Sequence, residues 1–200
     1  AKITIPTKDN FKFAGYYNQL SNGEQMIDEN GELTGNGGLV ASKLTSGQTW
    51  YAHWTKLNNL TLNNAGAKAG NANGTNLEDK TLYFLDGILY RDNHGATSVD
   101  FDKKIPNNNN NSYSKPYKDN KNFFDGYYNS YVKSAGVRVI GEDGIITNAG
   151  KADLKQSRDL IWYVQWRDAK SYSINLNKNG GTSGDSTYYW VESEDKKIYK

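Results

Sequence analysis

The chain repeats itself at an interval of about 112 residues, and this internal period limits its fold more than any other feature. Residues 14–18 read Ala-Gly-Tyr-Tyr-Asn, and residues 125–129 read Asp-Gly-Tyr-Tyr-Asn. In the same order, Thr-Trp-Tyr-Ala-His-Trp at 49–54 corresponds to Ile-Trp-Tyr-Val-Gln-Trp at 161–166. A period of this kind predicts a tandem array of similar structural units rather than one unique fold.

The repeat is out of phase with the chain. Leu-Thr-Leu-Asn at 60–63 matches Ile-Asn-Leu-Asn at 174–177, and each of these segments marks the start of a unit. We therefore predict that residues 1–56 are the C-terminal part of a repeat unit. Residues 57–168 are one complete unit, and residues 169–200 are the N-terminal part of a further unit. A unit of about 110 residues is large enough to bury roughly two thirds of its surface around its own core.

Short runs of aromatic and β-branched residues, separated by glycine and asparagine, predict a mainly β fold of small sheets with little helix. The pair Asn30 and Gly31 lies between two apolar-alternating runs, and Asp143 and Gly144 lie at the matching place in the next unit. Asn-Gly and Asp-Gly favour two-residue hairpin turns, because both turn residues must accept a positive φ. The substitution preserves the turn chemistry, which supports a hairpin in both units.

Helical periodicity is weak throughout, and residues 150–158 and the matching 38–46 are the best candidates for helix. Five consecutive asparagines at 107–111 have no counterpart in the first unit. We predict that a loop insertion near 107–114 carries this polar run on the surface.

Charge and composition argue against several classes of partner. The 24 basic and 22 acidic residues nearly balance, so electrostatics gives no reason to expect nucleic-acid or anionic-membrane binding. Apolar runs are far shorter than the roughly 18 residues that a membrane span needs, so no membrane insertion is expected. The absence of cysteine excludes disulfides and thiolate chemistry. Since no signal peptide is recognisable, we expect targeting information to lie outside this segment or to have been removed.

No reactive cluster emerges, and we expect no catalytic residues, no metal and no cofactor. His53 lies in an aromatic strand where the next unit has Gln165, and His94 lies in a polar loop. The acidic stretch at 28–32 resembles a calcium loop, but it lacks the alternate ligand spacing of an EF-hand. A hairpin turn is therefore the better interpretation of this stretch.

The aromatic residues permit two interpretations. Trp50 and Trp54 are four residues apart and share one face of a strand, which favours a core role, and Gly15 predicts a bulge in an aromatic strand. The expected repeat-defining core is Phe13, Gly15, Tyr16, Trp50, Trp54, Phe124, Gly126, Tyr127, Trp162 and Trp166. One tyrosine of each adjacent pair must face outward, where it could stack on a sugar ring. The candidate surface aromatics for such binding are Tyr17, Tyr51, Tyr128 and Tyr163.

These motifs resemble the Listeria–Bacteroides repeat family, also called internalin-type B repeats. The matching positions are Pro6, Thr7, Lys8, Phe13, Gly15, Tyr16, Tyr17, Tyr51, Ala52 and Trp54, and then Pro116, Lys118, Phe124, Gly126, Tyr127, Tyr128, Tyr163 and Trp166. The chain departs from the pattern where Asn10 and Asn120 replace a glycine and where Val164 replaces an alanine. The resemblance implies β-grasp-like units in tandem on secreted or surface-anchored bacterial proteins, with no catalytic residues.

The functional hypothesis is a non-catalytic repeat segment of a bacterial extracellular or cell-surface protein, acting as a structural stalk or as an adhesive or assembly module. Its expected partners are neighbouring repeats or copies of the same chain. Because 169–200 and 1–56 are complementary parts of one unit, copies could join head to tail into filaments. The alternative is a module that binds carbohydrate or a host receptor through surface tyrosines and tryptophans. An enzyme is the least favoured class.

Overall fold

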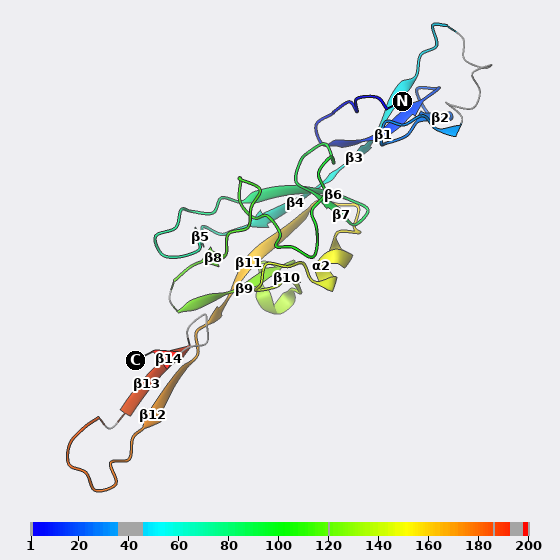
Figure 1. Cartoon of the computed structure of the whole chain (residues 1–200). Coiled ribbons are helices and arrows are strands. Elements are labelled where there is room, and N and C mark those ends of the chain that lie inside the picture. The colour runs from blue at the N-terminus through cyan, green and yellow to red at the C-terminus, as the bar shows by residue number, and fades with distance from the viewer. Residues whose placement is uncertain (1, 36–45, 120, 186, 193–197, 200) are drawn as a thin grey trace.

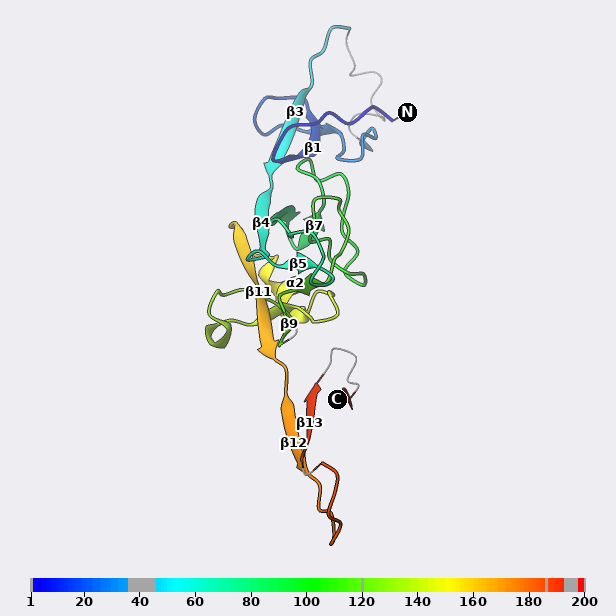
Figure 2. The same cartoon turned by 90° about the vertical axis from the view of Figure 1, so that its left-hand side faces the viewer.

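The computed structural model describes residues 2–35, 46–119, 121–185, 187–192 and 198–199. Strands dominate it, which confirms the mainly β prediction. Apart from Gly35, helix in these ranges is limited to one short α-helix and one 3₁₀ turn. Figures 1 and 2 show an elongated row of sheets with the N-terminus at one end and the C-terminus near the other.

The first sheet contains the strands β1 (Phe11–Tyr17), β2 (Gln25–Ile27) and β3 (Tyr51–Lys56), antiparallel in the order β2-β1-β3. The register of β1 against β3 shifts between Phe13 and Gly15, so the predicted bulge is present. Gly15 has a φ of 116°, and a Cβ there would lie 2.4 Å from the carbonyl oxygen of Ile27. Only glycine fits this bulge without displacing the neighbouring strand.

A six-stranded mixed sheet occupies the middle of the row (Figure 1). Its order is β10-β9-β11-β4-β6-β7, and β11 and β4 form its one parallel pair. A separate two-stranded ribbon joins β5 to β8. The bounds are β4 Asn58–Asn63, β5 Lys68–Ala69, β6 Lys80–Leu85, β7 Ile88–Tyr90, β8 Pro116–Tyr117, β9 Asn122–Tyr128, β10 Arg138–Ile140 and β11 Leu160–Asp168.

One core packs against this sheet, and its largest fully buried side chains are Trp162 and Tyr127. Its other members are Leu60, Leu62, Leu82, Phe84, Leu89, Val99, Ile105, Phe124, Val139, Ile140, Ile146, Leu154, Leu160 and Val164. The alternation of buried and less buried residues along β4 and β6 places Leu60, Leu62, Leu82 and Phe84 on the core side. These strands are amphipathic, as a sheet with one solvated face requires.

The connection from β10 to β11 contains helix α2 (Asn148–Asp153), which overlaps the predicted helix at 150–158 but is shorter. Thr147 caps it by accepting a hydrogen bond from the Gly150 amide, and this cap fixes where the helix begins. A 3₁₀ helix, η2 (Lys133–Ala135), lies between β9 and β10. The other predicted helix, at 38–46, lies outside the described residues except for its last position.

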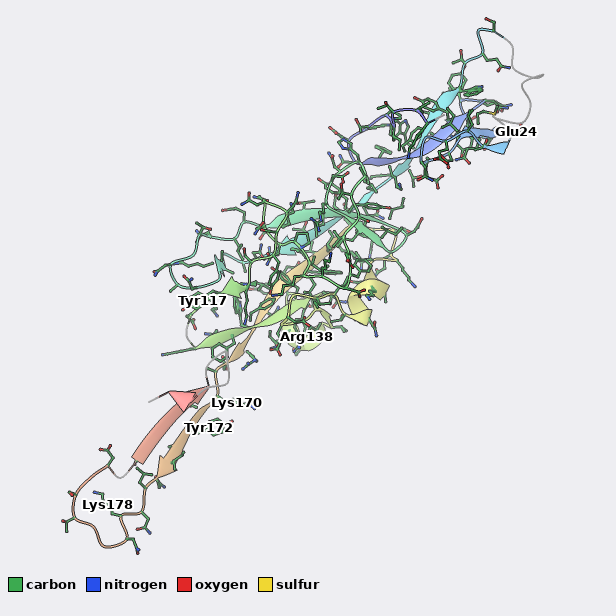
Figure 3. All side chains as sticks on the ribbon, viewed as in Figure 1. Glu24, Tyr117, Arg138, Lys170, Tyr172 and Lys178 are labelled. Carbon is green, nitrogen blue, oxygen red and sulfur yellow. The ribbon has the colours of Figure 1, made fainter. Side chains whose placement is uncertain are left out.

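The third sheet contains β12 (Ser171–Asn175), β13 (Thr187–Glu192) and β14 (Ile198–Tyr199), antiparallel in that order. Every residue of β12 is exposed. In Figure 2, β12 continues in the direction of β11, as β4 continues in the direction of β3. Lys170 and Tyr172 lie where the chain passes into this sheet (Figure 3).

Two local predictions need correction. The turns at Gly31 and Gly144 have a positive φ at the glycine alone, and Asn30 and Asp143 do not share it. Each turn is a longer loop: in the first, the Asp28 amide donates to the Glu32 carbonyl, and Gly31 donates back to Asp28.

The asparagine run is also not wholly exposed. Asn107 is 1% exposed, because its amide group donates to the Ser114 carbonyl and to the Tyr127 hydroxyl. At the other end of the run, Asn111 accepts a hydrogen bond from the buried Lys80 ammonium over 2.8 Å. The asparagine run is therefore hydrogen-bonded to buried residues at both ends, and Asn109 and Asn110 between them face solvent.

Candidate functional site

The aromatic residues of the first sheet form a compact edge-to-face cluster. The Phe13 ring lies 5.3 Å from Tyr16 at 66° and 5.6 Å from Trp54 at 68°. Phe13 is 3% exposed, whereas Tyr16 and Trp54 are half-buried. Edge-to-face packing of this kind stabilises a pair beyond the area that it buries.

The six-stranded sheet contains the same cluster. Its Phe124 ring lies 5.6 Å from Tyr127 at 71° and 6.4 Å from Trp166 at 72°. Gly126 has a φ of 112°, and a Cβ there would meet the Ile140 carbonyl oxygen at 2.1 Å. The sequence predicted the bulge at Gly15 and assigned Gly126 and the rings of both clusters to the repeat-defining core.

The two clusters differ in what covers them. Tyr127 and Trp162 are 0% exposed and Ile140 is 1% exposed, because all three pack into the core formed with β4 and β6. The corresponding residues of the first sheet border an open cavity of about 360 Å³. Its lining is Ile3, Thr4, Tyr16, Ile27, Gln48 and Trp50. This cavity, with a mixed apolar and polar lining, lies where the six-stranded sheet has core.

The candidate surface tyrosines fall into three different environments. Tyr51 is exposed at 37%, while Tyr17 is half-buried and stacks on His53, with ring centroids 4.1 Å apart. Tyr163 is also half-buried, and the ring of Tyr131, which is 76% exposed, packs edge-on against it at 5.8 Å.

Tyr128 is not a surface residue, which corrects the sequence prediction. It is 8% exposed, and its hydroxyl donates to the Asp125 carboxylate over 2.9 Å. The side chain of Arg138 also hydrogen-bonds to this hydroxyl and lies over the ring. The alternation of strand residues failed here because β9 is covered on both faces, as its nearly continuous burial shows.

Asp125 is the centre of a polar cluster that the sequence did not single out. Its carboxylate is 7% exposed and is paired with the Arg138 guanidinium at 2.6 Å and with the Lys133 ammonium. Burial alone would raise the pKa of Asp125, but hydrogen bonds from Lys133 and Tyr128 and the charge of Arg138 outweigh it. The pKa therefore lies below its ordinary value. The available signal was that the repeat replaces Ala14 by Asp at this position.

A second buried polar network surrounds the Tyr127 hydroxyl. This hydroxyl donates to the Asn64 side-chain oxygen and accepts from Asn107. Burial raises the pKa of Tyr127, so its phenol stays neutral across the physiological range. The indole of Trp162, another core residue, donates to the Asp153 carboxylate over 2.8 Å. In each case a buried polar atom has a partner, and the arrangement is structural.

The histidines do not join a reactive cluster. His53 contacts the Gln19 carbonyl oxygen at 3.0 Å, and His94 contacts the Asp9 carboxylate at 3.0 Å, joining the first sheet to the loop after β7. Within the described residues, no three His, Asp or Glu side chains are grouped closely enough to hold a metal ion.

No helix among the described residues has the length and apolar character needed to cross a bilayer. Comparison of the chain with protein-family models, with curated proteins and with solved structures finds no match. The family resemblance seen in the sequence therefore stays a prediction.

Proposed function

We propose that the chain is a non-catalytic scaffold of tandem β-grasp-like units of the Listeria–Bacteroides repeat type, serving as a stalk or assembly module. One observation carries this proposal. The strands β2-β1-β3 and β10-β9-β11 have the same order, the same antiparallel pairing, a glycine bulge at the same place and the same aromatic cluster.

The remaining strands repeat in the same way. The orders β4-β6-β7 and β12-β13-β14 match, and both are antiparallel. In the six-stranded sheet the two halves meet through the parallel pair of β11 and β4, the last and first strands of residues 57–168. A central parallel pair between first and last strands, with a helix before the last, is the arrangement expected of a β-grasp-like unit.

The junctions between units support a linear stalk. At one junction the Leu57 amide donates to the Asn10 carbonyl over 2.9 Å, and at the other the Ala169 amide donates to the Lys121 carbonyl over 2.7 Å. These bonds occupy matching positions, so successive units are joined in the same way. Regular junctions between similar units produce a rod, as in other repeat proteins.

The setting that fits such a rod is a bacterial extracellular or cell-surface protein, where neighbouring repeats or copies of the same chain are its partners. A polar surface with nearly balanced charge suits a spacer that presents other regions. Head-to-tail association of complementary half-units would extend the rod into filaments.

Two solution measurements test the proposal. Small-angle scattering of the monomer should give the distance distribution of a rod, and a compact, nearly spherical particle would contradict the stalk. Light scattering behind size exclusion, across a concentration series, tests assembly. A mass that stays near 22.4 kDa at every concentration would refute head-to-tail assembly while leaving the stalk intact.

Glycan binding is the second candidate function, and a specific surface feature favours it. The exposed Tyr131 ring packs edge-on against the half-buried Tyr163. A polar cavity of about 240 Å³ elsewhere on the unit is lined in part by Asn76, Asn108 and Ser114. Aromatic faces and amide groups are the chemistry that sugars need. Binding on a glycan array that is lost in Tyr131→Ala would support this function, and a flat array would count against it.

A further inference from the structure

The polar cavity of about 240 Å³ lies between two loops, which span residues 70–79 and 107–115. Both loops extend from the ribbon of β5 and β8, which lies beside the six-stranded sheet in Figure 1. The polar side chains that line the cavity include Thr75, Asn76 and Glu78 from one loop and Asn108, Asn109 and Asn110 from the other. Since all six carry a hydroxyl, amide or carboxylate group, the cavity suits a ligand rich in hydroxyls better than an apolar one.

Main-chain hydrogen bonds hold the 70–79 loop in place. The Ala69 amide donates to the Thr75 carbonyl over 2.8 Å, and the Leu77 amide donates to the Ala67 carbonyl over 2.7 Å. Gly74 is required where the loop folds back, because a Cβ there would collide with the Ala69 carbonyl oxygen. This wall of the cavity is therefore formed before any ligand binds.

The side chain of Asn108 holds the 107–115 loop in place. Its oxygen accepts hydrogen bonds from the amides of Asn110 and Ser112, over 3.0 and 3.1 Å, and its amide group donates to the hydroxyls of Ser112 and Ser114. The adjoining Asn107 is buried and hydrogen-bonded to the core. Because both walls are preorganised, little binding energy is lost in ordering the loops around a ligand.

The side-chain amides of Asn76, Asn109 and Asn110 form no intramolecular hydrogen bond within the described residues. All three residues are exposed, whereas Leu77 in the same lining is 5% exposed. The cavity thus combines an apolar floor with a rim of unused amides. A sugar ring has the matching shape, with an apolar face of C–H groups and a rim of hydroxyls. Each amide both donates and accepts, so it can bind two adjacent hydroxyls of one ring.

Charge and volume narrow the class of sugar. Glu78 lines the cavity and takes no part in the ion pairs among the described residues, so its carboxylate repels uronic and sialic acids and leaves uncharged sugars. A volume of about 240 Å³ holds roughly eight water molecules at liquid density, which is the space of one sugar ring rather than of an oligosaccharide.

We propose that this cavity binds one uncharged pyranose ring, either the terminal residue of a glycan or a free monosaccharide. This inference rests on the second candidate function, the binding of sugars, and assigns it a site and a sugar class. Asn76 and Asn109 contact the ring hydroxyls from the two opposite loops. Asn108 is a positioning residue, and Glu78 selects against anionic sugars.

Saturation-transfer NMR on the whole chain tests the cavity, with methyl glycosides of neutral hexoses and N-acetylhexosamines as the ligands. A glycan array that carries the same sugars at chain ends tests their source. The contact variants are Asn76→Ala and Asn109→Ala. The matched control is Asn73→Ala, which removes an exposed amide of the same 70–79 loop that does not line the cavity. Because these side chains are exposed, all three variants should keep the urea midpoint of the wild type.

We expect at least one neutral glycoside to bind the wild type and to bind about tenfold more weakly to each contact variant, since each loses hydrogen bonds to the sugar. Asn73→Ala should bind as the wild type does. The corresponding uronic acid should bind Glu78→Gln but not the wild type. Array binding that the free glycoside competes away would identify a glycan end as the ligand, whereas glycoside binding with a flat array would identify a free monosaccharide.

Other results would overturn the inference. Sugar binding that survives both contact variants, or that falls equally in Asn73→Ala, would show that the cavity is not the site. Glycan binding would remain as a function if that binding were lost in Tyr131→Ala. Equal binding of the neutral glycoside and the uronic acid to the wild type would overturn the role of Glu78. No response to any glycoside, together with a flat array, would refute sugar binding itself.

Discussion

Replacing Trp162 by phenylalanine tests whether the six-stranded sheet is closed around its tryptophan while the first sheet is open around Trp50. The Trp162 side chain is 0% exposed, and its indole donates to the buried Asp153 carboxylate over 2.8 Å. Phenylalanine keeps an aromatic ring in the core but removes this donor and part of the packed area. The matched variant Trp50→Phe makes the same chemical change where the side chain is only half-buried.

The expected cost follows from these two losses. Leaving a buried carboxylate without one of its donors costs about 2 kcal/mol, although Asp153 retains Gln156 as a partner. The smaller ring leaves a void that adds about 1 kcal/mol. The Trp162 variant should therefore lose about 3 kcal/mol of local stability. The Trp50 variant should lose less than about 1 kcal/mol, because solvent already contacts that side chain.

Hydrogen exchange with mass spectrometry measures both effects, at a concentration where light scattering shows monomer. For Trp162→Phe, amides in β9 should exchange roughly a hundredfold faster, since each 1.4 kcal/mol or so is a factor of about ten. For Trp50→Phe, amides in β1 should change by less than about fivefold. Equal acceleration in the two variants would refute the argument that one sheet is closed and the other open.

Three further substitutions test the local arguments. Gly126→Ala should lower the free energy of unfolding by more than about 2 kcal/mol, because a Cβ at a φ of 112° would meet the Ile140 carbonyl oxygen. Urea denaturation measures this loss, and an unchanged midpoint would contradict the bulge. Asp125→Ala should destabilise, and Arg138→Gln should cost less once Asp125 is gone, which a double-mutant cycle measures. Because the pKa of Asp125 is lowered in the fold, its ionised form stabilises above the ordinary carboxyl pKa of about 4, and this contribution is lost as the pH falls through the folded value. The wild type should therefore lose more stability than Asp125→Ala between neutral and acidic pH, and parallel pH profiles would contradict this. Asn107→Ala should cost about 1–3 kcal/mol in thermal or urea unfolding by leaving buried groups unpaired, whereas an alanine at an exposed residue of the same loop should be neutral.

The sequence predicted those features that depend on local chemistry. The bulge at Gly15 and the aromatic core positions followed from short motifs, because a φ of 116° beside a neighbouring carbonyl oxygen leaves no room for a Cβ. The turn between β6 and β7 is also local, because Asp86 and Gly87 both have a positive φ. Each of these features depends on residues that lie close together in the sequence.

The features that the sequence missed depend on remote partners. Tyr16 and Tyr127 occupy the same motif, yet only Tyr127 is fully buried, because strands from residues 58–90 cover it. Periodicity could not reveal that Tyr128 pairs inward with Asp125, or that Asn107 reaches the Tyr127 hydroxyl across 20 residues of chain. A motif specifies what a residue can contact, and the topology decides whether the contact exists.

The parallel pair at the centre of the six-stranded sheet has a mechanical consequence. The chain enters residues 57–168 at the start of β4 and leaves at the end of β11, and these two strands are parallel neighbours. Tension along the rod therefore pulls the pair in opposite directions along its own axis. The strands must slide past each other, which loads all of their hydrogen bonds together instead of peeling them one by one. The segment 57–168 thus resists stretching with its whole central ladder at once.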